Sequence, residues 1–166
     1  MSDVFTLDNA LKRMSEWRSR GERIVFTNGV FDILHLGHVT YLEAAATLGD
    51  RLIVGMNNDQ SVRALAKGPE RPINPEHARA SVLAALRCVD AVVIFGESTP
   101  YELITALQPD VLVKGGDYDP NETNPEAKTY MVGSDVVRAR GGEVASIPLV
   151  EGFSTTNIIR SIGKKD

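Results

Sequence analysis

The sequence predicts an α/β fold: a single open, doubly wound sheet of five parallel strands with helices on both faces. Two observations predict it: five short apolar runs follow one another along the chain, and the segments between them have helical periodicity. Apolar residues are consecutive in most of these runs, as is typical of strands that are buried on both faces. Strands that alternate with helices pair in parallel through right-handed crossovers, which gives an open α/β sandwich.

An amphipathic helix is predicted before the first strand, with Thr6 as its N-cap, apolar residues from Leu7 to Trp17 on one face, and Gly21 as its stop. The predicted strands are IVFT from Ile24, LIVGM from Leu52, AVVIF from Ala91, VLV from Val111 and VASIP from Val144. Two helices are predicted between the strands at His38 to Leu48 and Asp59 to Ala66. A third is capped by Asn74 with Pro75 as its first residue, and a fourth is opened by a capping box of Thr99, Pro100 and Glu102. The last predicted helix is capped by Ser154 or Thr155. In the last helix we expect Ile158, Ile159 and Ile162 to face the core.

Length and composition limit the class of protein. With 166 residues and 18.1 kDa the chain fits one domain, residues 1–166, with residues 1–21 as an N-terminal helix packed on its core. An excess of 22 acidic over 18 basic residues disfavours a nucleic-acid partner, because the net field repels a phosphate backbone. No apolar run approaches the roughly 20 residues of a membrane span, and no signal peptide is recognisable. The single cysteine, Cys88, excludes an internal disulfide, so we expect a cytoplasmic protein with no membrane partner.

The segment TNGVFDILHLGH, residues 27–38, joins the first predicted strand to a helix and carries two histidines, His35 and His38. Backbone N–H groups at a helix N-terminus carry partial positive charge and bind anionic oxygens. Gly37 lets a ligand approach the backbone closely, and both imidazoles add donors for phosphate. One alternative is that one histidine caps the helix while the other packs. A second is a zinc site formed with Asp32, for which no further ligand lies nearby in the sequence.

The first half of this segment supplies hydroxyl, amide and backbone donors where the strand ends. We expect Thr27, Asn28, Gly29 and Phe31 to form a phosphate cradle, although a tight turn would use the same residues. Asp32 either orients a substrate hydroxyl or fixes the loop.

Three further segments bring charge or backbone freedom to the predicted site: a basic loop at the end of the helix Asp59 to Ala66, and two loops that follow strands. In open α/β sheets the loops that follow strands hold the ligand. Lys67, Arg71 and Arg79 belong to a basic loop and the helix after it, where Lys67 is expected to close on phosphate and the two arginines to bind substrate, although the helix dipole alone favours cations there.

The other two segments follow the fourth and fifth predicted strands. In KGGDY, Lys114, Gly115 and Gly116 can border a planar base, and Asp117 can accept from sugar hydroxyls, whereas a plain turn would use the same residue types. Ser154, Thr155 and Thr156 exceed what a helix cap needs and are expected to offer further N–H and O–H donors to phosphates.

Taken together, HLGH at His35 to His38 and STT at Ser154 to Thr156 resemble the signatures of the cytidylyltransferase-like branch of the nucleotidyltransferases, which has a Rossmann-like fold. The order TNGVFDILHLGH, RP, AALRCVD, VLVKGGDY and STTNII, from about Arg23 to Ile162, is similar to the adenylyltransferases of that branch that act on D-glycero-D-manno-heptose 1-phosphate. The resemblance implies transfer of AMP from ATP to that sugar phosphate, giving ADP-heptose and pyrophosphate for lipopolysaccharide core biosynthesis. It also implies Mg²⁺ held mainly by substrate phosphates, a homo-oligomer, and a stand-alone enzyme, because the chain has no room for the kinase half that such enzymes often carry.

Three other functions remain open. The first is a cytidylyltransferase that acts on CTP and a polyol phosphate, although Leu149 and Val150 stand where relatives that act on CTP commonly have Arg and Thr. The second is a sensor that binds ATP without turnover. The third is a metal-dependent hydrolase that uses Asp32, His35 and His38. The segment from Asn121 to Asp135 has no role that the sequence assigns.

Overall fold

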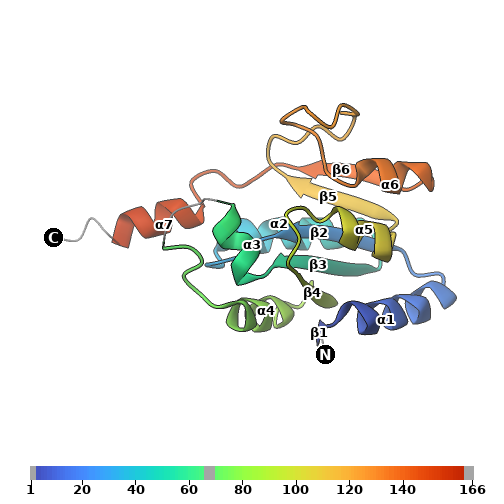
Figure 1. Cartoon of the computed structure of the whole chain (residues 1–166), viewed down its shortest axis with the longest axis horizontal. Helices are drawn as coiled ribbons and strands as arrows, with labels where there is room; N and C mark the ends of the chain where they lie inside the picture. The colour runs from blue at the N-terminus through green and yellow to red at the C-terminus, as the bar shows by residue number, and fades with distance from the viewer. Residues whose placement is uncertain (1–2, 66–69, 163–166) are drawn as a thin grey trace.

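The computed structural model describes residues 3–65 and 70–162, which form a parallel sheet between two layers of helices (Figure 1). In these residues the sheet has six strands in the order β1-β4-β3-β2-β5-β6. The strands are β1 (Asp3–Phe5), β2 (Ile24–Gly29), β3 (Arg51–Asn57), β4 (Ala91–Phe95), β5 (Val111–Gly115) and β6 (Glu143–Ile147). The α/β class and all five sequence-based strands are confirmed. The runs in β2, β3, β4 and β5 are mostly buried between helices on both sides, whereas β6, at the edge of the sheet, is only partly buried.

The expected number of strands is wrong, because β1 adds a sixth strand at the edge of the sheet. Asp3, Val4 and Phe5 pair with Ala91, Val92 and Val93 of β4. Three residues, two of them exposed, are too few to give a periodic signal in the sequence. The first residues of the chain therefore extend the sheet before the opening helix begins.

Most of the helices pack in two layers, one on each face of the sheet. They are α1 (Leu7–Ser19), α2 (Leu36–Ala46), α3 (Asp59–Ala64), α4 (Glu76–Ala84), α5 (Tyr101–Leu107), α6 (Ser134–Ala139) and α7 (Thr155–Ile162). One core cluster joins α1, α5 and α6 to one face of the sheet, and a second joins α2 and α4 to the other face. The longest of these helices, α1, has 13 residues, and no helix of the described residues is long and apolar enough to cross a membrane.

The opening helix α1 packs on the core as expected. Its N-cap is Thr6, whose side chain accepts a hydrogen bond from the backbone N–H of Asn9 at 3.3 Å. Met14 is fully buried, and the chain leaves the helix through Gly21, which has a positive φ of 74°.

Two predicted helix starts differ in detail. α4 takes Pro75 as its N-cap, because the side-chain amide of Asn74 donates to the backbone oxygen of Asp32 instead of capping the helix. α5 has Pro100 as its N-cap and no side-chain cap hydrogen bond, so the expected capping box is not formed.

The expectation that α7 packs its isoleucines on the core is wrong. None of its residues is buried, and Ile162 is 70% exposed. Figure 1 shows α7 reaching outward beyond the carboxyl ends of the strands, where the chain has passed β6. A helix in this position lies past the end of the sheet and has no core surface beneath it.

The order of the strands places the site. β2 lies between β3 and β5, so the chain leaves it towards β3 and β4 on one side and later returns to β5 and β6 on the other. Such a switch point opens a crevice at the carboxyl ends of the strands. Phe31, directly after β2, has a φ of 49°, which marks the sharp turn of the chain into this crevice.

Candidate active site

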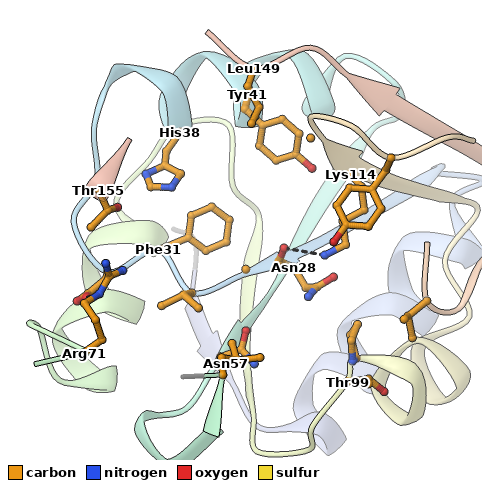
Figure 2. Close-up of a pocket in the computed structure, with 18 of the residues that line it drawn as sticks. Asn28, Phe31, His38, Tyr41, Asn57, Arg71, Thr99, Lys114, Leu149 and Thr155 are labelled. Atoms are coloured by element: carbon orange, nitrogen blue, oxygen red, sulfur yellow. Dashed lines mark hydrogen bonds and ion pairs between the residues drawn. The ribbon is translucent and has the colours of Figure 1, made fainter. Parts of the chain in front are cut away.

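A cleft of about 810 Å³ lies at the carboxyl ends of β2, β3, β4 and β5 and reaches the first turn of α7 (Figure 2). Most of the residues expected in the site meet there. Those that line the cleft are Asn28, Gly29, Phe31, Asp32, His38, Arg71, Lys114, Gly115, Thr155 and Thr156. Segments from both halves of the chain therefore line the same cleft.

The two histidines stand at the start of α2 but have different positions. His35 is the N-cap residue, and its backbone oxygen accepts from the N–H groups of His38 and Val39 at 2.9 and 3.2 Å. The two rings are stacked with centroids 3.9 Å apart. His38 lines the cleft, whereas His35 lies behind it, and its Nδ1 has no hydrogen-bond partner in the described part of the chain. Burial lowers the pKa of His35, which favours the neutral ring beside His38.

Gly37 is closely packed against these rings. A Cβ atom at this position would lie 3.1 Å from the ring of His35 and 3.3 Å from the Cβ of Phe153. The glycine therefore allows the α2 N-terminus to approach both the histidine pair and the segment that leads into α7.

Thr27 lies beneath the cleft and does not line it. The threonine is fully buried, and its Oγ1 forms a hydrogen bond of 2.6 Å with the hydroxyl of Tyr41. The Tyr41 hydroxyl also donates to the backbone oxygen of Val113 at 3.2 Å, and burial raises the pKa of Tyr41 to about 12. This buried pair joins β2, α2 and β5 below the site.

Asp32 fixes the loop that precedes α4. Its carboxylate accepts hydrogen bonds from Nε of Arg71 at 2.6 Å and from the backbone N–H groups of Ile73 and Asn74 at 2.9 Å. The side chains of Asp32 and Arg71 are 0% and 7% exposed, so this ion pair is buried. Of the two roles that the sequence leaves open for Asp32, the observed contacts favour fixing the loop, and they hold Arg71 at the edge of the cleft.

The other two basic residues expected in the site differ from Arg71. The side chain of Arg79 is fully buried and donates to the backbone oxygens of Asn74 and Val30 and to the carboxylate of Asp59, with distances of 3.0, 2.6 and 2.7 Å. Arg79 does not line the cleft, and these contacts correct its expected role from binding substrate to bracing the loop. Lys67 lies outside the described residues, in the segment 66–69.

The loop after β5 forms the wall opposite α7. The ammonium group of Lys114 donates to the backbone oxygen of Asn28 at 3.3 Å and lies 5.7 Å from the ring centre of Tyr118. A Cβ atom on Gly115 would lie 2.7 Å from the Leu149 side chain, so the glycine lets Leu149 cover this loop. Asp117 faces a second hollow of about 890 Å³, which shares Gly115, Tyr118 and Leu149 with the cleft.

The three hydroxyl residues before and in α7 divide between capping and lining. Ser154 is the cap, because its Oγ accepts from the backbone N–H of Asn157 at 3.1 Å. Thr155 and Thr156 line the cleft. This arrangement leaves two hydroxyls, together with the helix N-terminus, directed at a ligand.

Several residues that line the cleft were not expected there from the sequence. These are Val30, Tyr41, Asn57, Leu65, Ser98, Thr99, Pro100, Tyr118, Tyr130, Val132 and Leu149. Asn57 ends β3, and Ser98 and Thr99 closely follow β4, so the rule that ligands bind beyond strand ends would have found them. Tyr130 and Val132 come from the long segment after β5, for which the sequence offers no such signal.

In residues 3–65 and 70–162, no group of three or more His, Cys, Asp and Glu side chains is placed to hold a metal ion. Asp32 would be the third ligand in the metal-site alternative, but its carboxylate is directed at Arg71 and the loop, as described above.

The model of the cytidylyltransferase-like family matches residues 26–161, from β2 to α7. The chain belongs to the cytidylyltransferase-like family. It is a nucleotidyltransferase of that family, and the histidine pair and the hydroxyls of α7 lie within the matched region.

Curated relatives of this cytidylyltransferase-like domain are considerably longer. The chain is 55% identical over 159 residues to the bifunctional protein HldE of Methylobacillus flagellatus, which covers 96% of this chain and 31% of that protein. It is 57% identical over 145 residues to HldE of Syntrophotalea carbinolica, covering 87% of this chain and 28% of that protein. The chain thus spans less than a third of the curated relatives it matches.

Solved structures agree with the family. A lipopolysaccharide core biosynthesis protein from Thermoplasma volcanium is 28% identical, with a TM-score of 0.59, over 78% of this chain and 98% of that one. Pantothenate synthetase from Thermus thermophilus is 16% identical, with a TM-score of 0.61, over 95% of this chain and 67% of that one. At that identity, the second likeness concerns the fold alone.

Proposed function

We propose that this nucleotidyltransferase transfers AMP from ATP to D-glycero-D-manno-heptose 1-phosphate and releases ADP-heptose and pyrophosphate, as a step towards a lipopolysaccharide core. The observation that carries the proposal is that the starts of two helices, α2 with His38 and α7 with Thr155 and Thr156, meet at one cleft. Backbone and side-chain donors at two helix N-termini suit a polyphosphate. The choice of ATP and of a heptose is supported by the motifs from TNGVFDILHLGH to STTNII and by relatives named HldE at 55% and 57% identity.

The reaction needs no nucleophile from the protein. A phosphate oxygen of the acceptor attacks the α-phosphorus of ATP in line, a new P–O bond forms, and the bond to the β-phosphate oxygen breaks as pyrophosphate leaves. Catalysis then consists of positioning both substrates and stabilising charge on the phosphoryl oxygens. ATP is taken as its Mg²⁺ complex, in which the ion neutralises phosphate charge and is held mainly by substrate oxygens and water.

Each wall of the cleft receives one part of the substrates in this proposal. His38 donates to the reacting phosphate, and neutral His35 stacks against it and fixes its orientation. Thr155 and Thr156 bind the pyrophosphate, with Arg71 at the same edge. Gly115 and Leu149 border adenosine, and Asp117 accepts from hydroxyls at the adjoining hollow. Lys67, which lies outside the described residues, is proposed to bind the phosphates.

A pyrophosphate-release assay tests the proposal. Purified protein is given each of the four nucleoside triphosphates with heptose 1-phosphate, hexose 1-phosphates and glycerol 3-phosphate, and release is expected with ATP and heptose 1-phosphate. His38→Ala should reduce turnover by about 10²- to 10³-fold, the loss typical of one donor to a developing charge. His77→Ala is the matched control, because His77 is exposed and does not line the cleft.

Each result has a defined meaning. Preference for CTP with glycerol 3-phosphate would replace the proposal by the cytidylyltransferase alternative. Binding of ATP with no turnover on any acceptor would favour the sensor. We also propose a homo-oligomer, which sedimentation velocity would detect as a mass above 18.1 kDa.

A further inference from the structure

One end of the cleft carries amide and hydroxyl side chains and no available carboxylate. Figure 2 shows Asn28, Asn57 and Thr99 well away from Thr155. Ser98, next to Thr99, and Tyr130 also line the cleft, and Tyr130 shares Asp135 as a hydrogen-bond partner with Tyr101 at the start of α5. The buried Oδ1 of Asn28 has no hydrogen-bond partner among the described residues. Asp32 is the one acidic residue among the described residues that line the cleft, and its carboxylate forms a buried ion pair with Arg71.

Tyr130 comes from an irregular segment, residues 119–132, that is held firmly in place. The backbone N–H of Asp119 donates to the oxygen of Thr129 at 3.0 Å, and Met131 is fully buried in the core. The guanidinium of Arg138 on α6 donates to the backbone oxygens of Pro120 and Glu122. The segment therefore forms an ordered wall, from which Tyr130 and Val132 line the cleft.

The hydroxyl of Tyr130 is oriented by Asp135 on α6, to which it donates at 3.2 Å. Asp135 also accepts from the hydroxyl of Tyr101 at 3.3 Å, but Tyr101 does not line the cleft. Because its proton is directed to Asp135, the oxygen of Tyr130 retains a lone pair that can accept from a ligand hydroxyl.

The direction of the reaction assigns this end to the acceptor. In an in-line transfer the leaving group and the attacking oxygen lie on opposite sides of the phosphorus. Figure 2 shows Thr155, His38 and Arg71 on one side of the cleft and Thr99, Asn28 and Lys114 on the other. With pyrophosphate at Thr155, the acceptor phosphate enters from the side of Asn28 and Lys114, and the rest of the acceptor extends towards Thr99 and Tyr130.

We propose that this end of the cleft is the acceptor subsite, that it selects the phosphate of an uncharged polyhydroxylated sugar, and that Thr99 and Tyr130 determine this specificity. Amide and hydroxyl groups both donate and accept, which suits a row of sugar hydroxyls. A cationic acceptor such as choline phosphate or ethanolamine phosphate would meet the ammonium of Lys114 and no available carboxylate. This inference rests on the proposed nucleotidyl transfer and names the residues that choose its acceptor.

The test compares Thr99→Val and Tyr130→Phe with the unchanged protein, using pyrophosphate release at varied acceptor and varied ATP. Each variant should raise KM for the sugar 1-phosphate roughly 3- to 10-fold, as expected for one lost neutral hydrogen bond, and leave KM for ATP unchanged. Tyr101→Phe is the matched control, because it removes the other hydrogen bond to Asp135 outside the cleft, and it should change neither KM. A fall in the preference for a sugar phosphate over glycerol 3-phosphate should accompany the rise in KM.

The outcomes separate this inference from the proposed function. If no pair of nucleotide and acceptor releases pyrophosphate, the proposed transfer is wrong, and the inference about the acceptor subsite is wrong as well. If pyrophosphate is released but choline phosphate or ethanolamine phosphate is the preferred acceptor, the transfer stands and the inference is overturned. The inference is also overturned if the two variants raise KM for ATP instead, or if Tyr101→Phe matches the effect of Tyr130→Phe.

Discussion

At the scale of single residues, Asp32 joins two loops that the sequence separates by about 40 positions. The Asp32 side chain is 0% exposed and accepts from Arg71, Ile73 and Asn74. The change Asp32→Asn keeps the shape but removes the charge that compensates the buried guanidinium. Because a buried ion left without its partner is strongly unfavourable, we expect the free energy of unfolding to fall by about 3–5 kcal/mol. Urea denaturation followed by circular dichroism measures this.

A matched control exists on the surface. Glu143→Gln makes the same type of change in an ion pair with Arg23. The side chains of Glu143 and Arg23 are 55% and 47% exposed. Screening by water should limit its effect to about 1 kcal/mol or less. Equal losses in the two variants would contradict the structural role given to Asp32.

His35 gives stability a dependence on pH at the same scale. Burial lowers its pKa from 6.5, so the unfolded chain binds a proton more readily than the folded one. The free energy of unfolding should therefore rise with pH across the interval from the lowered pKa up to about 6.5 and gain nothing more from this group above it. In His35→Gln the difference in melting temperature between pH 5.5 and pH 7.5 should be smaller than in the unchanged protein, as differential scanning fluorimetry can measure. An unchanged or larger difference would show that His35 titrates normally in the fold.

At the scale of elements, α7 shows that an apolar helix face is not by itself evidence that the face is buried in the core. Ile162 of α7 is 70% exposed, whereas Ile104 of α5 is fully buried. Ile104→Ala should lower the free energy of unfolding by about 2–5 kcal/mol, because it leaves a cavity in the core. Ile162→Ala should change it by less than about 0.5 kcal/mol, as is usual at exposed positions. Comparable losses measured by urea denaturation would show instead that the isoleucine face of α7 is covered.

The strands were predictable for a physical reason, whereas the surroundings of α7 were not. Runs such as AVVIF from Ala91 must be buried on both faces, and a sheet between two helical layers is the arrangement that provides this. A helix with one apolar face indicates only that some surface should cover it. The same isoleucines fit a core, a partner or a ligand site, and the sequence does not distinguish these. The strand β1 could not be predicted from the sequence, because its three residues are too few to form a periodic pattern.

At the scale of the whole molecule, topology explains which parts of the site the sequence could indicate. The loops after β2 and β5 and the start of α7 carry unusual residues in recognisable order, and the cleft brings them together. Asn57, Ser98 and Thr99 are ordinary polar residues whose role depends on β3 and β4 lying beside β2. Tyr130 reaches the cleft through a 14-residue irregular segment, residues 119–132, whose path depends on contacts with α6 rather than on local pattern. Arg79 shows the opposite case, since a basic residue near a phosphate site is used inside the fold.

The same topology predicts that nucleotide binding stabilises α7 more than the central strands. Without ligand, α7 has no buried residue, but Thr155 and Thr156 line the cleft. Phosphates that accept hydrogen bonds from these residues would link α7 to α2. Mg²⁺–ATP should therefore slow amide hydrogen exchange at Asn157 and Ile158, and amide exchange in the buried strand β2 should stay nearly unchanged. A ligand at about 100 times its dissociation constant adds about 2.7 kcal/mol to the free energy of unfolding, which corresponds to a rise in melting temperature of roughly 5–10 °C for a domain of this size. Thr155→Val with Thr156→Val should remove most of both effects, whereas Thr47→Val, an exposed change at the far end of α2, should retain them. Protection of β2 without protection of α7 would contradict the assignment of the pyrophosphate to this helix.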